Sequence, residues 1–266
     1  MLRSMKAAAV DYARPASLGE AIALLARGDV EARPLAGGQS LVAMMNLRLA
    51  APDLLVDIAR LPELAESDED DASVTLGACV THAAIEDGRV PDPSRGLMPH
   101  VAASLAYRAI RNRGTLGGSL ALADPAAEWP AVVAALDGAV VATGPQGERV
   151  IPAADFVTGL YETRLAPSEI VARLRLPKLS PAARWGYVKL ARKAGEFALS
   201  LAVAVRDPAR GLARIVIGAA DGPPLVIDGE FDEARTRAAI DARGFDAFRG
   251  GLHAAAALRA ARQARP

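Results

Sequence analysis

Residues 111–136 read RNRGTLGGSLALADPAAEWPAVVAAL and hold more structural signals than any other part of the chain. Within them, Thr115-Leu116-Gly117-Gly118-Ser119 predicts a tight turn with a hydroxyl at each end. Glycine accepts a positive φ and lets the backbone approach a ligand closely, and consecutive amides in such a turn form a concavity that binds anions. An Asp124-Pro125 step follows, and a helix is expected to run to Leu136. The segment therefore predicts an anion-binding turn mounted on helices.

An earlier segment repeats this chemistry. Residues 34–49 read PLAGGQSLVAMMNLRL, in which Ala36-Gly37-Gly38-Gln39-Ser40 predicts a glycine turn between a short strand and a helical turn. Neither turn is a GxGxxG motif or a P-loop, because no Lys-Ser/Thr pair follows the glycines. Each turn alone is more often an ordinary structural turn than a ligand site. Two turns of the same chemistry favour the interpretation that they form opposite walls of one cleft for a diphosphate.

Four charged side chains near the later turn each allow two interpretations. Asp124 and Glu128 could accept hydrogen bonds from the hydroxyls of a ribose or ribityl chain, but an aspartate before proline also forms an Asx turn. Arg111 and Arg113 could neutralise a phosphate, or they could cap the end of the preceding helix. The residues themselves leave these alternatives open.

The C-terminal third adds two further candidate ligand contacts. Lys189 lies in a basic cluster along a predicted strand, which is either a solvated face or a binding edge. Phe197 either packs in the core or stacks on a planar ligand. The chain contains no GxSxG, no HExxH and no spaced Cys/His pair. We therefore predict no catalytic side chain, and any chemistry must be carried by a cofactor.

Composition excludes several classes of protein. The 266 residues include 31 basic and 31 acidic side chains, and this balance argues against a nucleic-acid binder. The hydrophobic fraction of 52% excludes wholesale disorder. Cys79 is the only cysteine, so the chain can form no internal disulfide, thiolate zinc cage or iron–sulfur cluster, and no metal site is predicted. No apolar run is long enough to span a membrane, and the expected location is the cytoplasm.

The order of predicted elements indicates an α+β protein with a boundary near residue 177. Strands alternate with helices before that point, and residues 98–110 (MPHVAASLAYRAI) predict one helix. After it, three apolar runs separated by turns predict three antiparallel strands, followed by helices in an Ala/Arg-rich tail. The expected division is an N-terminal domain over 1–177 and a C-terminal α+β domain over 178–266.

Several stretches, taken in order, resemble a known family. They are VDYARPASLGEAIALLA, PLAGGQSLVAMMNLRLAAPDLLVDI, TLGACVTH, AIRNRGTLGGSLALADPAAEWPAVVAALDGAV and YVKLARKAGEFALSLAVAV. Together they resemble the FAD-binding medium subunit of molybdenum hydroxylases, the group of aerobic carbon monoxide dehydrogenase and the xanthine dehydrogenases. The resemblance implies a two-subdomain FAD-binding fold of the p-cresol methylhydroxylase type (subdomains about 1–58 and 59–177), with FAD held between the subdomains. Two positions depart from the usual pattern: Ala43 replaces a common proline, and Leu122 replaces a common histidine.

The resemblance also implies a set of FAD contacts. They fall at Ala36, Gly37, Gly38, Gln39, Ser40, Leu105, Thr115, Gly117, Gly118, Ser119, Asp124, Glu128, Ile170, Lys189 and Phe197. In this set the two glycine turns hold the pyrophosphate and the two carboxylates follow the second turn. Ile170 lies beside the flavin, Lys189 places a positive charge near it, and Phe197 lies against the isoalloxazine.

The resemblance finally implies partners. A large molybdenum-cofactor subunit would oxidise the substrate, and a small subunit with two iron–sulfur clusters would relay electrons to FAD on this chain and so to an external acceptor. Such complexes are commonly dimers of heterotrimers. Two alternatives remain: a stand-alone FAD oxidoreductase acting on a small molecule, and a scaffold that has kept the fold without the cofactor.

Overall fold

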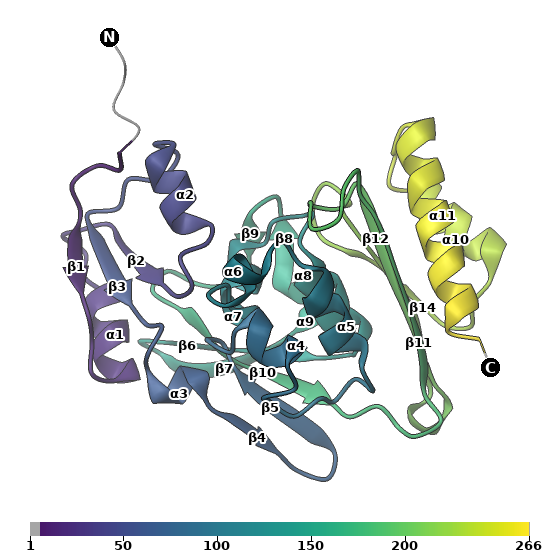
Figure 1. Ribbon diagram of the computed structural model, residues 1–266, viewed down its shortest axis with the longest axis horizontal. Coiled ribbons are helices and arrows are strands. Elements are labelled where there is room, and N and C mark those ends of the chain that lie inside the picture. The colour runs from purple at the N-terminus through teal and green to yellow at the C-terminus, as the bar shows by residue number, and fades with distance from the viewer. Residues whose placement is uncertain (1–5, 266) are drawn as a thin grey trace.

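Three β-sheets lie side by side in the computed structural model, which describes residues 6–265 (Figure 1). The first is a parallel sheet of order β1-β3-β2, made of β1 (Asp11–Ala13), β2 (Ala32–Leu35) and β3 (Leu54–Asp57). Helices α1 (Leu18–Leu25) and α2 (Leu41–Asn46) connect its strands. The Ser17 hydroxyl accepts from the Glu20 amide, and the Glu20 carboxylate accepts from the Ala16 amide, so polar side chains fix the start of α1.

The second sheet is antiparallel and has the order β4-β5-β10-β6-β7. Its strands are β4 (Ser67–Glu69), β5 (Ser73–Gly77), β6 (Ala139–Gly144), β7 (Gly147–Pro152) and β10 (Ile170–Pro177). Helix α3 (Pro62–Ala65) precedes β4. The helices between these strands are α4 (His82–Glu86), α5 (Leu97–Ser104), α6 (Arg108–Arg111), α7 (Leu116–Leu122), α8 (Glu128–Ala135) and α9 (Ala153–Phe156). A small hairpin pairs β8 (Val157–Gly159) with β9 (Glu162–Thr163). All residues of α8 are buried, which makes this helix the centre of the molecule.

The third sheet is antiparallel and contains one strand more than predicted. Strands β11 (Arg184–Leu190), β12 (Ser200–Asp207) and β13 (Leu212–Gly218) match the three expected runs. A fourth strand, β14 (Leu225–Asp228), pairs with β13, so the prediction of three strands was wrong. Only four residues follow the Pro223-Pro224 step before the next turn, and so short a run carries little strand signal. Helices α10 (Glu233–Asp241) and α11 (Ala247–Gln263) complete the chain.

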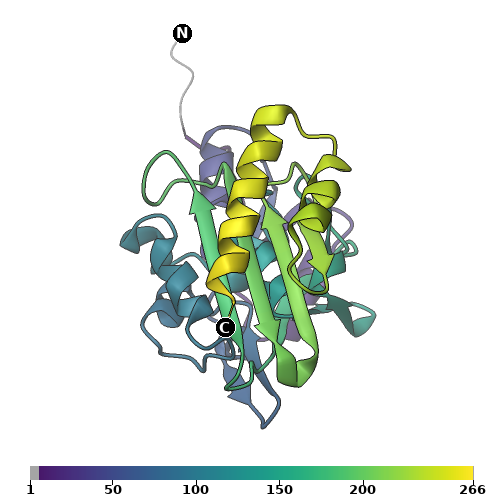
Figure 2. The ribbon, with the colours of Figure 1, turned by 90° about the vertical axis from the view of Figure 1, so that its right-hand side faces the viewer.

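The alternation of side chains along β12 explains how the third sheet is covered on both faces. Leu201, Val203 and Val205 enter the core that contains α8 and the second sheet. Ala202 and Ala204 face the alanine-rich side of α11, which lies across the outer face of the sheet (Figure 2). Small residues on both sides bring helix and sheet close together. The predicted boundary after residue 177 falls between β10 and β11, and one hydrophobic core continues across it.

The helix predicted over 98–110 is broken in the structure. Helix α5 ends at Ser104, and α6 begins only at Arg108. Between them Leu105 is extended, and Ala106 has a positive φ of 37°. Leu105 instead forms an isolated bridge with Gly195 in the loop between β11 and β12. This contact is distant in the sequence, and the local apolar spacing did not reveal it.

Candidate functional site

The two glycine turns touch. A Cβ on Gly37 would lie 2.1 Å from the carbonyl oxygen of Arg113, immediately before the second turn. The Arg113 Nε donates to the Gly37 carbonyl at 3.4 Å. A Cβ on Gly118 would lie 3.8 Å from the Cβ of Ala36. The two turns are therefore in contact, as one shared site would require. Only glycine at position 37 permits this backbone contact.

The first turn keeps its amides available. Within residues 6–265, the N–H groups of residues 37–41 have no protein acceptor. Gly38 has a φ of +73°, which turns the backbone sharply at this point. The Gln39 side chain donates to the Gly37 carbonyl at 3.2 Å, and the exposed Ser40 hydroxyl makes no capping bond. Such a run of unpaired amides around a positive-φ glycine is available to an anionic ligand.

The second turn uses its amides internally. The Leu116 and Gly117 N–H groups donate to the carbonyls of Val80 and Ala78 at 2.9 and 2.8 Å. The Gly118 amide donates to the Thr115 hydroxyl at 3.1 Å, which caps α7. A Cβ on Gly117 would lie 2.3 Å from the Cβ of Ala78, so packing beside β5 requires this glycine.

Two parts of the second turn stay accessible. The backbone of Gly118 is exposed, and Ser119 is half-buried. Both follow the buried Thr115, whose hydroxyl is already engaged by the turn. The second turn therefore offers a ligand an open surface and one hydroxyl, where the first turn offers a row of amides.

Asp124 forms the Asx turn that was one of its two interpretations. Its Oδ1 accepts from the Ala126 amide at 2.9 Å, and its Oδ2 accepts from the Tyr161 hydroxyl at 3.2 Å. Burial and the Asp124 charge raise the pKa of Tyr161, which keeps this phenol protonated as a donor. The half-buried carboxylate is thereby fixed in place beyond the end of α7.

Glu128 and Lys189 bind each other. The Lys189 Nζ lies 2.6 Å from Glu128 Oε1, and the two side chains are only 10% and 5% exposed. Burial raises the pKa of Glu128, and the neighbouring lysine opposes that rise. The pair joins the first turn of α8 to β11, so it connects the second sheet's helices with the third sheet. The charge of Lys189 is balanced by this partner.

His82 holds the backbone just before the second turn and is itself bound by Trp129. His82 Nδ1 accepts from Trp129 Nε1 at 3.1 Å, and the His82 amide donates to the Gly114 carbonyl. A Cβ on Gly114 would lie 2.9 Å from the imidazole ring. Burial and the Arg111 charge lower the pKa of His82 to about 4, so the ring is neutral at pH 7.

The remaining predicted contacts lie in three different environments. Ile170 is buried in the core between the first and second sheets, with Ala21 and Leu25 among its neighbours. Leu105 is buried at the break between α5 and α6. Phe197 is 63% exposed and lines an open pocket of about 300 Å³ with Arg192, Glu196 and Leu199. The Leu105–Gly195 bridge places Leu105 against the loop that carries Phe197, whereas Ile170 belongs to a separate cluster.

Sequence reasoning missed two features of this site. It treated the two turns as equivalent, although only the first has free amides. It also left Arg111 unassigned between phosphate neutralisation and helix capping, and the structure shows Arg111 paired with Glu86. The sequence carried no local signal for this pairing, because the partner lies 25 residues away. Within the described residues, no group of three or more His, Cys, Asp or Glu side chains could hold a metal, and no helix is long and apolar enough to cross a membrane.

A glycine turn with open amides that touches a second glycine turn, carried on an α+β fold, is suited to an anionic nucleotide-like cofactor. Comparison with protein families identifies which one. A family model described as the FAD binding domain in molybdopterin dehydrogenase matches residues 6–179. The chain belongs to this family: it is an FAD-binding medium subunit of the molybdenum hydroxylases, a component of an oxidoreductase, and FAD is its cofactor.

Individual relatives agree with this assignment. The 6-hydroxypseudooxynicotine dehydrogenase complex subunit alpha of Paenarthrobacter nicotinovorans is 37% identical over 76% of this chain and 68% of its own length. The carbon monoxide dehydrogenase medium chain of Hydrogenophaga pseudoflava is 35% identical over 85% of this chain and 79% of its own length. A solved carbon monoxide dehydrogenase from the same organism superposes with a TM-score of 0.87 at 31% identity, covering 97% of this chain and 98% of that one.

Proposed function

We propose that this chain holds FAD with its pyrophosphate on the first glycine turn and passes electrons from iron–sulfur clusters of a partner subunit to an external acceptor. The observation that carries the proposal is the row of unpaired amides over residues 37–41, next to the second turn.

The residues present fit FAD. A pyrophosphate is an anion with many acceptor oxygens, and the unpaired amides of the first turn are donors without side-chain bulk. The open surface of Gly118 lets the chain of the cofactor pass close to the backbone, while Ser119 and Asp124 offer a hydroxyl and a carboxylate to its sugar-like hydroxyls. When bound, FAD supplies electron exchange in one- or two-electron steps. The chain's own residues bind the cofactor, orient it and limit its exposure to water.

In this proposal the ring end of FAD lies toward the loop of residues 191–199. Phe197 is the one large exposed aromatic side chain of that loop, and the adjoining pocket is lined by a cation, an anion and an apolar side chain. Leu105 contacts this loop through its bridge with Gly195. Lys189, whose buried side chain pairs with Glu128 of α8, lies on β11 just before the loop and fixes the position from which the loop departs.

We further propose the assembly that the relatives' names suggest. One relative is named a medium chain and another a medium subunit. By analogy, this chain would be the FAD-binding component beside a large molybdenum-cofactor subunit and a small subunit with two iron–sulfur clusters, in a dimer of heterotrimers in the cytoplasm. Residues 1–177 would form the FAD-binding domain, of the p-cresol methylhydroxylase type, and 178–266 the C-terminal domain; residues 1–5 and 266 lie outside the described structure.

The first experiment is an FAD titration of the full-length chain followed by visible absorption, with acid release to identify the flavin. We expect a bound flavin spectrum that is lost or weakened in Gly38→Val and in Gly118→Val, and that persists in Gly211→Ala. Gly211 is a suitable control because it also has a positive φ (61°) and an added Cβ would meet nothing within 4 Å. Absence of flavin from both the isolated chain and the co-purified complex would overturn the proposal.

A second experiment tests the direction of electron flow. The complex, with and without FAD, is reduced with one equivalent of titanium(III) citrate, and the iron–sulfur EPR signals are followed after adding a tetrazolium acceptor. We expect rapid loss of the cluster signals only when FAD is present. Equal rates with and without FAD would show that electrons leave the complex by another route.

A further inference from the structure

Helix α6 has only four residues, and it lies between two segments that contact the 191–199 loop and the first glycine turn. Its N-terminal side adjoins the break at residues 105–107, and its C-terminal side leads directly into Arg113, Gly114 and the second glycine turn. We propose that Arg111 is a positioning residue that fixes α6 and thereby sets the first glycine turn and the 191–199 loop relative to each other. This inference rests on the proposed FAD site.

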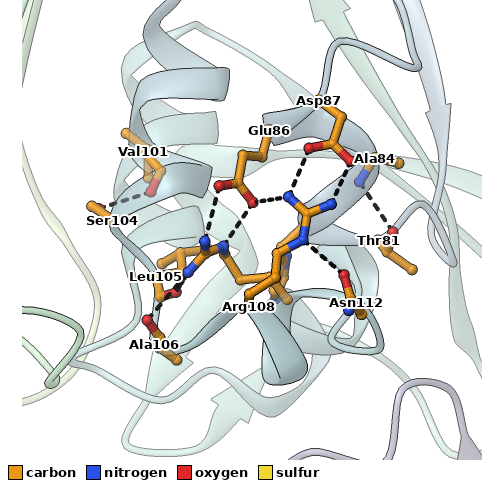
Figure 3. Close-up of polar contacts among 12 residues, drawn as sticks. Thr81, Ala84, Glu86, Asp87, Val101, Ser104, Leu105, Ala106, Arg108 and Asn112 are labelled. Atoms are coloured by element: carbon orange, nitrogen blue, oxygen red, sulfur yellow. Dashed lines mark hydrogen bonds and ion pairs between the residues drawn. The ribbon is translucent and has the colours of Figure 1, made fainter.

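An ion-pair network holds α6 on α4 (Figure 3). Arg111 contacts both carboxylate oxygens of Glu86, at 2.7 Å through Nε and 2.9 Å through Nη2. Arg108 makes a forked contact with Asp87 at 2.7 and 2.6 Å and also reaches Glu86 at 2.9 Å. Forked arginine–carboxylate contacts fix orientation as well as distance. The buried fork of Arg111 therefore sets the position and rotation of α6, whereas the exposed fork of Arg108 is screened by water and adds little.

Arg111 also donates hydrogen bonds to backbone carbonyls, whereas Arg108 contacts side chains only. The Arg111 Nη1 donates to the carbonyl of Leu105 at 2.8 Å and to the carbonyl of Ala106 at 3.2 Å. These two carbonyls belong to the helix break, where Ala106 has a positive φ. The Arg111 side chain is only 12% exposed, whereas that of Arg108 is 47% exposed. Arg111 thus supplies donors to backbone groups that lost their helical partners.

The helix break at residues 105–107, stabilised by Arg111, contacts the 191–199 loop. Leu105 bridges Gly195, and a Cβ on Gly195 would lie 2.9 Å from the Ala106 carbonyl, one of the two oxygens that Arg111 binds. Gly195 itself has a φ of +81°. Because Phe197 follows two residues later, the position of this aromatic ring depends on the carbonyls that Arg111 holds.

The residues that follow the C-terminal end of α6 contact the first glycine turn. Two residues after Arg111, the Arg113 carbonyl lies against Gly37, and the Arg113 side chain donates to the Gly37 carbonyl. A rotation of α6 would therefore move both the open amides and the loop with Phe197. In the proposed site these two regions contact opposite ends of one extended cofactor.

The test uses Arg111→Gln and, as a matched control, Arg108→Gln in the full-length chain. Both substitutions remove an ion pair between α4 and α6, but only the first removes the donors to the helix break. In Arg111→Gln we expect amide hydrogen exchange in 191–199 to rise about tenfold without cofactor. We expect its FAD affinity to fall about tenfold, because the site is no longer preorganised. In Arg108→Gln both quantities should stay within about twofold of the parent.

Arg111→Lys keeps the positive charge and guards against misfolding of the first variant. Lysine cannot reproduce the fork to Glu86 together with two carbonyl contacts, so we expect intermediate exchange in 191–199 and a changed visible circular dichroism of bound FAD. Equal effects of Arg111→Gln and Arg108→Gln, or unchanged exchange in 191–199 in both Arg111 variants, would overturn the inference. The exchange measurement needs no FAD, so a parent chain that fails to bind FAD would contradict the proposed function alone.

Discussion

The two glycine turns of this chain look alike in sequence and differ in structure. The turn from Ala36 to Ser40 leaves a row of amides unpaired. The turn from Thr115 to Ser119 uses its amides in hydrogen bonds to the residues after β5 and to its own helix cap. Gly37 and Gly117 are both required by close packing, against Arg113 and Ala78 respectively. Only Gly38 combines a positive φ with neighbouring free amides. The same residue pattern therefore leaves amide donors open in one turn and supports the fold in the other.

The difference arises from the backbone carbonyl groups that are packed against one turn and not against the other. The second turn lies on the residues that follow β5, whose carbonyls accept its N–H groups. The first turn ends a short parallel strand and has no such acceptors within the described residues. A glycine turn binds a ligand when its amides are left without partners, and neighbouring backbone decides that. The predictions below separate the structural and the ligand-binding contributions.

The largest effect on stability is expected for Lys189→Met. This change leaves Glu128 buried without its partner, and breaking one half of a buried ion pair costs about 3–5 kcal/mol. Urea unfolding of the chain without FAD measures the loss. Because removing both charges restores an uncharged contact, Lys189→Met combined with Glu128→Leu should regain most of it. A single variant as stable as the parent would show that the pair contributes little to joining α8 and β11.

Gly117→Val should come next. Its side chain would occupy the space of Ala78 in the core, and such overpacking costs about 3 kcal/mol. The matched variant Gly118→Ala sits at an exposed backbone and meets only the Thr115 hydroxyl, so we expect a loss of about 1 kcal/mol from the disturbed cap. If the two variants unfold at the same urea concentration, the second turn is not the structural element described here.

Acid should weaken the support of the second turn. The pKa of His82 lies near 4 in the folded chain, below its ordinary value of 6.5, so the unfolded chain binds more protons between these values. The contribution of neutral His82 is complete above pH 6.5 and is lost as the pH falls toward 4, which amounts to roughly 2 kcal/mol between pH 7 and pH 5.

His82→Asn tests this assignment, because an amide oxygen can still accept from Trp129 but does not titrate in this range. We expect the variant to be less stable than the parent at pH 7 and to lose less stability on acidification. His253, with a pKa also near 4, should supply the pH dependence that remains. A parent and variant with identical pH profiles would exclude His82 as the responsible group.

A small change in stability but a large change in binding is expected for Gly38→Ala. A side chain at positive φ costs about 1–2 kcal/mol, and Gly211→Ala, at a similar φ in open space, should cost the same. Only Gly38→Ala should also weaken FAD binding, by about tenfold or more, because it redirects the free amides. Equal FAD affinities in the two variants would place the pyrophosphate elsewhere.

The sequence was informative wherever the determinants are local. It predicted the α+β class, both glycine turns, and the Asx turn as one of two roles for Asp124. It did not predict the break after Ser104, because the Leu105–Gly195 bridge and the Arg111 contacts are tertiary. It placed Lys189 near the flavin without showing that Glu128, 61 residues earlier, balances its charge. These contacts exist only after the sheets have assembled.

The most direct test of the account is a TROSY NMR titration of the 15N-labelled chain with FAD, following each backbone amide of the two turns. We predict large downfield shifts of the amide protons of residues 37–41, which gain charged acceptors, and small shifts for residues 116–119, whose acceptors are already in place. Large shifts confined to the second turn, or none in residues 37–41 at saturating FAD, would contradict the central claim that the first turn holds the pyrophosphate.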